Sequence, residues 1–146
     1  MKYLFILISF LSFIQFSLAA EKTYTLQSGD ASLSVVKDGK RLILQTGNAH
    51  YLSLNAPYVV TLEVNAETLN GYYSSVKEEK GSLVCIAKLK SSHGTVFHVK
   101  DVFAPDTENH FRMDREVTIE KIGKGDDYFN SYFGLTLQRK TQIEDF

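Results

Sequence analysis

Arg115 is the charged residue whose sequence position most clearly suggests chemistry. It lies between Met113 and Val117 on the apolar face of an alternating segment. A guanidinium on such a face must be paired and hydrogen-bonded, because an unpaired buried charge is costly. Asp101, on the expected neighbouring strand, is the natural partner. The sequence therefore predicts a structural ion pair between Asp101 and Arg115. The alternative is that Arg115 contacts an anion or an acidic sugar.

The histidines and carboxylates show no spacing that indicates catalysis or metal binding. No two histidines are two or four residues apart. Asp126 and Asp127 could bind calcium, but their spacing is not that of an EF-hand. The sequence has no glycine-rich phosphate loop, GxSxG or HExxH motif. We predict no catalytic residue, metal or cofactor in this chain. The four histidines are His50, His93, His98 and His110, and the candidate carboxylates are Asp101, Asp106, Glu108, Asp114, Glu116, Asp126 and Asp127.

Tyrosines are the remaining candidates for contact with a ligand. Tyr72 and Tyr73 are adjacent, so a strand through them would present one ring on each face. Tyr132 lies on the strand face opposite Phe133. An exposed tyrosine can stack on a sugar ring and also hydrogen-bond through its hydroxyl. We predict Tyr72, Tyr73 and Tyr132 as binding residues. The alternative is that these rings only cover the sheet surface.

Length, charge and cysteine content limit the class of protein. The 146 residues allow one domain, and 44% of them are hydrophobic, as in a globular protein. The net charge of -1 gives no electrostatic reason to expect nucleic acid as a partner. Cys85 is the one cysteine, so the chain has no internal disulfide framework. Because Cys85 stands in an apolar run, we expect a small core residue.

The first twenty residues have the order of a secretory signal peptide. Lys2 provides a basic start, an apolar run follows, and Ser17 and Ala19 are small residues at the expected cleavage site. The apolar run is short for a transmembrane anchor, which is the alternative. We therefore predict a signal peptide at 1–20, a β-sandwich domain at 21–146, and a secreted or periplasmic protein that has no membrane contact after cleavage.

Period-two alternation of apolar and polar residues dominates the rest of the chain. It predicts an all-β fold, an antiparallel β-sandwich of about 8–10 strands. Asp38 and Gly39 favour a hairpin turn between the second and third strands. Residues 65–71 are expected to form a turn or a single helical turn. The expected strands are 23–27, 31–36, 41–46, 51–54, 58–64, 72–77, 82–90, 95–103, 111–122 and 129–137.

The segment from Gly94 to Leu137 resembles a known domain through four stretches in it or at its edge. They are H-G-T at 93–95, V-K-D-V-F at 99–103, F-R-M-D-R-E-V at 111–117 and D-Y-F-N-S-Y-F at 127–133. Their order is similar to that in the N-terminal β-sandwich of secreted six-hairpin, (α/α)6-barrel glycosidases and related polysaccharide-degrading enzymes. In that family the sandwich packs against the barrel, which carries the catalytic carboxylates. The resemblance therefore implies a polysaccharide or a catalytic barrel domain as partner, and no catalytic residue here.

These observations favour a noncatalytic β-sandwich of a secreted carbohydrate-active enzyme. Such a domain would act as a scaffold or as an accessory glycan contact, either in a freestanding chain or as the N-terminal fragment of the enzyme. The alternative is a freestanding secreted module that binds glycan or protein. A small hydrolase is a third hypothesis, and it would require a deep pocket with converging carboxylates or a Ser/His pair.

Overall fold

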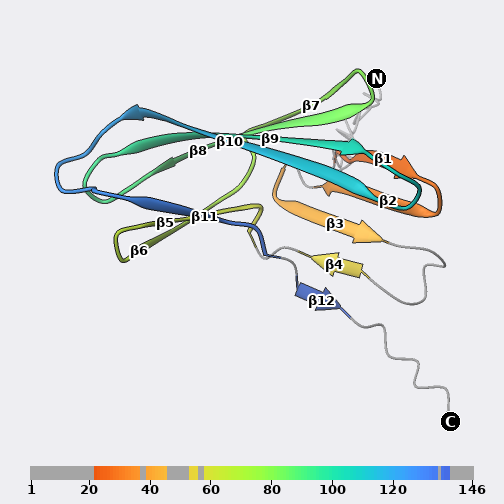
Figure 1. The fold of residues 1–146 in the computed structure, drawn as a ribbon, viewed down its shortest axis with the longest axis horizontal. Coiled ribbons are helices and arrows are strands. Elements are labelled where there is room, and N and C mark those ends of the chain that lie inside the picture. Colours follow the sequence, from red (N-terminus) through yellow and green to blue (C-terminus); the bar gives the residue numbers. More distant parts are fainter. Residues whose placement is uncertain (1–21, 37–38, 46–52, 56–57, 135, 139–146) are drawn as a thin grey trace, which may run out of the picture.

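All regular elements of the computed structural model are β-strands (Figure 1). The structure describes residues 22–36, 39–45, 53–55, 58–134 and 136–138. The predicted signal peptide at 1–20 lies outside these residues. No described residue belongs to a helix, so no membrane-spanning helix is found among them. The all-β prediction is confirmed, with twelve strands in the described residues in place of the expected 8–10.

The twelve strands form three antiparallel sheets. The five-stranded sheet has the order β1-β2-β3-β4-β12, the four-stranded sheet β10-β9-β8-β7, and the three-stranded sheet β11-β5-β6. The strands are β1 (Tyr24–Ser28), β2 (Ala31–Val36), β3 (Arg41–Gln45), β4 (Ser53–Asn55), β5 (Val60–Val64), β6 (Glu67–Gly71), β7 (Ser75–Glu79), β8 (Ser82–Lys90), β9 (Val96–Pro105), β10 (Phe111–Lys121), β11 (Phe129–Tyr132) and β12 (Thr136–Gln138).

The sheets are arranged as two layers. The long strands of the four-stranded sheet form one layer, and β6 packs on β8 while β1 packs on β7 to β9. Figure 1 shows the three-stranded sheet beneath one half of this layer and β1 to β4 beside the other half. The arrangement is sandwich-like, with one layer divided between two sheets.

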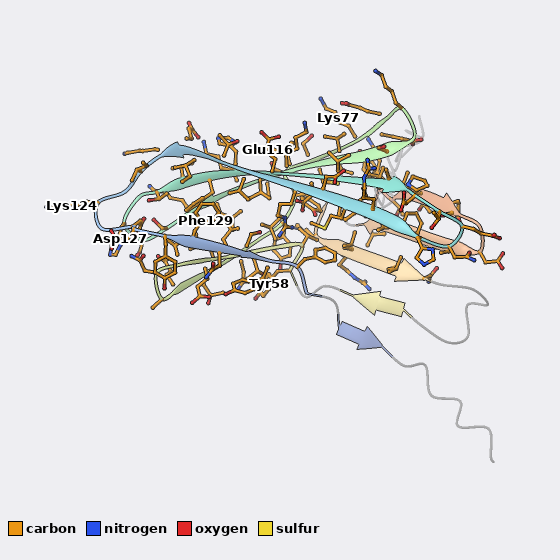
Figure 2. The ribbon with its side chains drawn as sticks, viewed as in Figure 1. Tyr58, Lys77, Glu116, Lys124, Asp127 and Phe129 are labelled. Atoms are coloured by element: carbon orange, nitrogen blue, oxygen red, sulfur yellow. The ribbon has the colours of Figure 1, made fainter. Side chains whose placement is uncertain are left out.

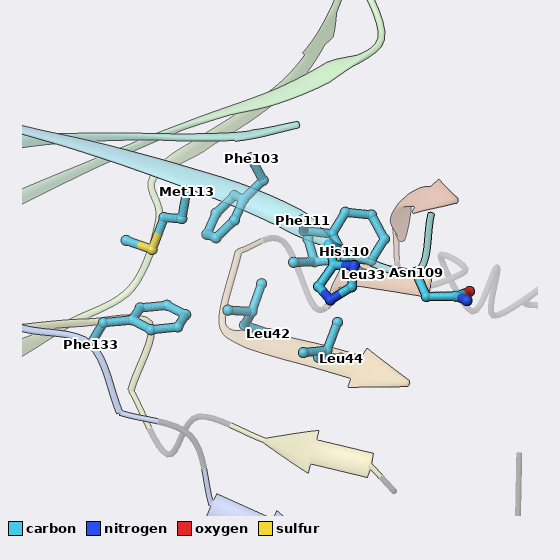
Figure 3. Close-up of a pocket in the computed structure, with 9 residues that line it drawn as sticks. All are labelled: Leu33, Leu42, Leu44, Phe103, Asn109, His110, Phe111, Met113 and Phe133. Atoms are coloured by element: carbon cyan, nitrogen blue, oxygen red, sulfur yellow. The ribbon is translucent and has the colours of Figure 1, made fainter. Parts of the chain in front are cut away.

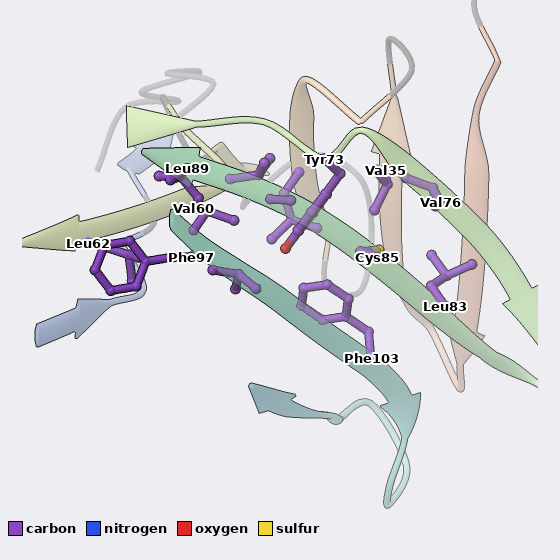
Figure 4. Close-up of a cluster of buried hydrophobic side chains, with 14 of the residues drawn as sticks. Val35, Val60, Leu62, Tyr73, Val76, Leu83, Cys85, Leu89, Phe97 and Phe103 are labelled. Atoms are coloured by element: carbon purple, nitrogen blue, oxygen red, sulfur yellow. The ribbon is translucent and has the colours of Figure 1, made fainter. Parts of the chain in front are cut away.

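One apolar core joins all three sheets (Figure 4). Its largest fully buried side chains are Phe97 and Phe103 from β9, and Leu42, Leu62 and Leu83 from the facing and neighbouring strands. In β5, β8 and β9 buried positions alternate with less buried ones, so burial of one strand face accounts for the fold. Cys85 is fully buried within the cluster, as the apolar run around it predicted.

The structure of residues 65–71 differs from the one expected from the sequence. They were expected to form a turn or a helical turn, but only Asn65 and Ala66 turn, and Glu67–Gly71 is strand β6. Asn65 has a φ of 50°, which lets the hairpin close in two residues. The inward positions of β6 hold Glu67, Leu69 and Gly71. Since only Leu69 is apolar, the strand has no hydrophobic alternation to recognise.

The last expected strand, 129–137, is also corrected. The structure divides it into β11, which pairs with β5, and β12, which pairs with β4 in another sheet. The chain crosses between the sheets after Tyr132. At this point the backbone carbonyl of Tyr132 accepts a hydrogen bond of 2.8 Å from Arg115, which ties the end of β11 to β10.

Candidate functional site

The outer face of the three-stranded sheet carries a group of exposed tyrosines. Tyr132 on β11 pairs in register with Thr61 on β5, and Thr61 pairs with Asn70 on β6, so their side chains share one face. Tyr72 follows β6 two residues after Asn70. We call this surface the tyrosine face; it comprises Tyr58, Tyr72, Tyr132, Thr61, Glu63 and Asn70.

The rings of the tyrosine face are available to solvent. Tyr58, Tyr72 and Tyr132 are 41%, 44% and 48% exposed. The rings of Tyr58 and Tyr72 lie 5.7 Å apart between centroids, at an angle of 43°. From the spacing of paired strands, the backbone positions of Tyr72 and Tyr132 are separated by about 12 Å. Figure 2 shows Tyr58 on the side of the molecule opposite Glu116, which lies on β10 of the four-stranded sheet.

Hydrogen bonds hold the polar groups of the tyrosine face in place. Tyr132 donates its hydroxyl proton to Glu63 Oε2 over 2.6 Å, and Thr61 Oγ1 donates to Asn70 Oδ1 over 3.0 Å. The hydrogen bond to Glu63 raises the pKa of Tyr132 above its ordinary value, so the ring stays neutral. The surface therefore offers apolar ring faces beside fixed amide, hydroxyl and carboxylate groups.

Tyr73 is not on this surface, which corrects its prediction as a binding residue. It is 2% exposed, and its ring lies inside the core cluster (Figure 4). Its amide donates to the carbonyl of Gly39 over 3.0 Å, and its hydroxyl donates to Asp101 Oδ2 over 2.5 Å. Burial, together with the charge of Asp101, raises the pKa of the hydroxyl far above its usual range. Tyr73 therefore acts as a structural hydrogen-bond donor.

Asp101 and Arg115 form the ion pair that the sequence predicted. They are directly opposite each other in β9 and β10. Arg115 Nε donates to Asp101 Oδ1 and Nη2 donates to Oδ2, each over 2.6 Å. Asp101 is fully buried and the Arg115 side chain is 10% exposed. Burial by itself lowers the pKa of Arg115, but the hydrogen bonds and charge of Asp101 outweigh that effect and raise it.

The same guanidinium connects the two layers. Nη1 donates to the carbonyl of Tyr132 over 2.8 Å and to Ser131 Oγ over 3.1 Å, and Nη2 donates to the carbonyl of Val59 over 3.3 Å. Every donor direction of Arg115 is therefore directed at this chain. The alternative in which Arg115 contacts an anion has no free donor to support it.

A second polar cluster ties the loops at one end of the molecule. Asp126 accepts hydrogen bonds from the hydroxyls of Ser91 and Thr95, and its Oδ1 lies 2.9 Å from His93 Nδ1. These contacts, led by Ser91 and Thr95, lower the pKa of Asp126 to about 2. Ser91 bonds to the carboxylate and not to the imidazole. The cluster thus lacks the serine–histidine hydrogen bond that nucleophilic catalysis requires.

A third cluster joins charged side chains of β8, β9 and β10. His98 Nε2 and Lys88 Nζ approach Glu120 Oε2 at 2.5 and 2.8 Å on the outer face of the four-stranded sheet, which lowers the pKa of Glu120. Within the part of the chain that the structure describes, no three His, Cys, Asp or Glu side chains converge as metal ligands do. The predicted absence of a metal, a cofactor and a catalytic residue stays a prediction.

An apolar pocket opens between the two layers at the other end. Leu33, Leu42 and Leu44 form one wall, and Phe103, Phe111 and Met113 form the other. Its volume is about 370 Å³. This pocket could not be predicted from the sequence, because the pattern at these positions is that of ordinary core-facing residues. Tyr58 was missed as well, since only the pairing of β5 with β6 brings it beside Tyr72.

Comparison with known proteins gives no further information on this surface. No protein-family model, curated protein or solved structure matches the chain. The class defined by the fold and its surfaces is therefore an all-β, sandwich-like domain with an exposed tyrosine face.

Proposed function

We propose that this chain is a noncatalytic β-sandwich that contacts glycan through the tyrosine face. The observation that carries the proposal is the grouping of three exposed tyrosine rings on one sheet surface, with Thr61 and Asn70 between them and Glu63 bonded to Tyr132. The proposal keeps Tyr72 and Tyr132 as binding residues, replaces Tyr73, and adds Tyr58.

Sugars require both kinds of group that this surface presents. The C–H faces of a pyranose ring are apolar and stack on aromatic rings, while its hydroxyls need hydrogen-bond partners. Tyr72 and Tyr132 lie far enough apart to contact different sugar units of one chain. A surface spread across three strands suits an extended polysaccharide better than a single monosaccharide, because several weak contacts then act together.

Glycan contact is consistent with the resemblance to the N-terminal sandwich of secreted six-hairpin glycosidases. On that resemblance we further propose that the chain is secreted or periplasmic and belongs to a carbohydrate-active system. Its role there would be to act as a scaffold, beside a catalytic barrel domain, or as an accessory glycan contact. A freestanding module that binds protein through the same tyrosines is the second candidate.

The test is retardation of the purified chain in native gels that contain soluble polysaccharides of different backbone chemistry. We expect retardation by at least one polysaccharide. Each of Tyr72→Ala and Tyr132→Ala should weaken binding about three- to tenfold, given about 0.5–1.5 kcal/mol for an aromatic contact. Tyr72→Phe, which keeps the ring, should bind more tightly than Tyr72→Ala.

Glu116→Ala is the matched control, because Glu116 is exposed on the outer face of the opposite layer. It should bind as the unmodified chain does. Equal retardation of the control and both tyrosine variants would place glycan contact elsewhere. No retardation by any polysaccharide, together with capture of a protein partner that Tyr72→Ala abolishes, would favour the protein-binding module instead.

A further inference from the structure

The apolar pocket between the layers has the dimensions and lining of a small-molecule site. Its volume of about 370 Å³ lies at the lower end of the range for ligand pockets, which are mostly apolar with few polar groups. Figure 3 shows Met113 and Phe133 at one end and His110 and Asn109 at the other. A ligand here would therefore have an apolar body and one polar end.

The polar end of the pocket is rigidly placed. His110 and Asn109 belong to the hairpin between β9 and β10, where Asn109 has a φ of 66°. Asn109 Oδ1 accepts a hydrogen bond of 2.7 Å from the amide of Asp30, and Ser28 Oγ donates to the carbonyl of Thr107 over 2.8 Å. These two contacts fix the hairpin against the β1–β2 turn, so the mouth of the pocket is preorganised.

The hydrogen bonds of His110 determine what its ring can offer. His110 Nδ1 lies 2.7 Å from the backbone carbonyl of Glu108, which can only accept, and 3.1 Å from Thr107 Oγ1, which can accept as well. Nδ1 therefore carries the proton in the neutral imidazole, and Nε2 is a hydrogen-bond acceptor. Such an acceptor is satisfied by a ligand hydroxyl.

The charge at the mouth argues against an anionic ligand. Asp30 and Glu108 are exposed and adjoin Asn109, one through the hydrogen bond to its side chain and the other in sequence. Two carboxylates beside the polar end repel a ligand carboxylate or phosphate. The aromatic side chains of Phe103, Phe111 and Phe133 in the lining suit a flat ring as the apolar body.

We propose that this pocket is a second binding site, which takes a compact neutral alcohol with an aromatic or cyclic body. The ring enters between the two layers, and the hydroxyl donates to His110 Nε2. The site is separate from the tyrosine face and does not depend on the glycan proposal.

The test compares three probes with the same ring, 2-naphthol, naphthalene and 2-naphthoate, by titration of the full purified chain near pH 7.5. We expect saturable binding of 2-naphthol, with naphthalene about tenfold weaker because it lacks the hydroxyl. The anionic 2-naphthoate should be the weakest of the three. Absence of saturable 2-naphthol binding, or 2-naphthoate binding as tightly as 2-naphthol, would overturn the proposal.

Variants connect the binding to this pocket. His110→Phe should weaken 2-naphthol about tenfold without changing naphthalene, while His110→Gln, which restores an acceptor, should recover part of the loss. Leu44→Phe fills the cavity and should abolish binding of all three probes. Circular dichroism and thermal unfolding establish that each variant is folded. Unchanged 2-naphthol affinity in Leu44→Phe would contradict the site.

One further variant separates this site from the tyrosine face. Tyr72→Ala should bind 2-naphthol as the unmodified chain does, whether or not its glycan binding is lost. A parallel loss of 2-naphthol affinity in Tyr72→Ala would show that the probe binds the exposed rings and would overturn the pocket proposal.

Discussion

Removal of the Arg115 side chain should destabilise the domain more than any exposed substitution. Asp101 is fully buried, and Arg115 supplies two of the hydrogen bonds to its carboxylate, with Tyr73 supplying the third. Arg115→Ala leaves the buried carboxylate without its counter-charge, at a cost of about 3–5 kcal/mol. It also leaves the carbonyls of Val59 and Tyr132 without their donor. For a domain with a typical unfolding free energy of about 5–15 kcal/mol, this is a large fraction.

Urea unfolding of a double-mutant cycle measures this coupling. The cycle comprises Arg115→Ala, Asp101→Ala and the double variant. The unfolding of each protein is followed by circular dichroism at pH 7. Each single variant leaves one buried charge unpaired, whereas the double variant removes both charges. The loss of unfolding free energy in the double variant should therefore be at least about 2 kcal/mol smaller than the sum of the losses in the two single variants. Additive costs, or a loss below about 1 kcal/mol for Arg115→Ala, would refute the reasoning.

Three other predictions follow from buried or constrained groups. The lowered pKa of Asp126, about 2, means that its contribution to folding stability is present above pH about 4 and is lost as the pH falls toward 2. Asp126→Asn should therefore flatten the pH dependence of the unfolding free energy in that window, and an unchanged profile would contradict it. Burial, and then the charge of Asp101, raises the pKa of the Cys85 thiol to about 12, so Cys85 should resist iodoacetamide until urea unfolds the chain. Mass spectrometry of the alkylated native protein checks this, and rapid native labelling would contradict it. Gly81 has a φ of 77° in the two-residue turn between β7 and β8, so Gly81→Ala should cost about 1–2 kcal/mol in thermal unfolding; an unchanged midpoint would contradict the strain.

The local alternation of apolar and polar residues was sufficient to predict much of the fold. β8, β9 and β10 alternate clearly, and their connections are short, so their pairing and the Asp101–Arg115 contact could be inferred from the sequence. Once the β9–β10 hairpin is assumed, the register needed to bring Asp101 opposite Arg115 is a local matter.

Features that depend on contacts between distant segments could not be inferred. The inward positions of β6 are occupied through distant partners: Glu67 accepts hydrogen bonds from Ser92 in the turn after β8, and Gly71 packs against Leu89 of β8. The ring of Tyr73 points into the core, where its hydroxyl donates to the buried carboxylate of Asp101, which is 28 residues further along the sequence. Neither the contacts of β6 nor the partner of Tyr73 can be predicted from the residues that lie near them in the sequence.

The tyrosine face also combines a feature that the sequence predicts with one that depends on contacts between distant segments. Exposure of Tyr72 and Tyr132 follows from strand alternation, but their placement on one surface requires β11 to pair with β5 across a long connection. Tyr58 precedes β5 and joins the face through its ring contact with Tyr72. The residue types suggested the chemistry, whereas the sheet topology determines which of them can act together.

The most direct test of the glycan proposal is amide chemical-shift mapping with an oligosaccharide from the polysaccharide that retards the chain most. The account predicts saturable shifts concentrated in β5, β6 and β11, around Tyr72 and Tyr132, with the outer face of β8 to β10 unchanged. Shifts confined to the outer face of the four-stranded sheet, or no shifts at saturating oligosaccharide, would contradict it.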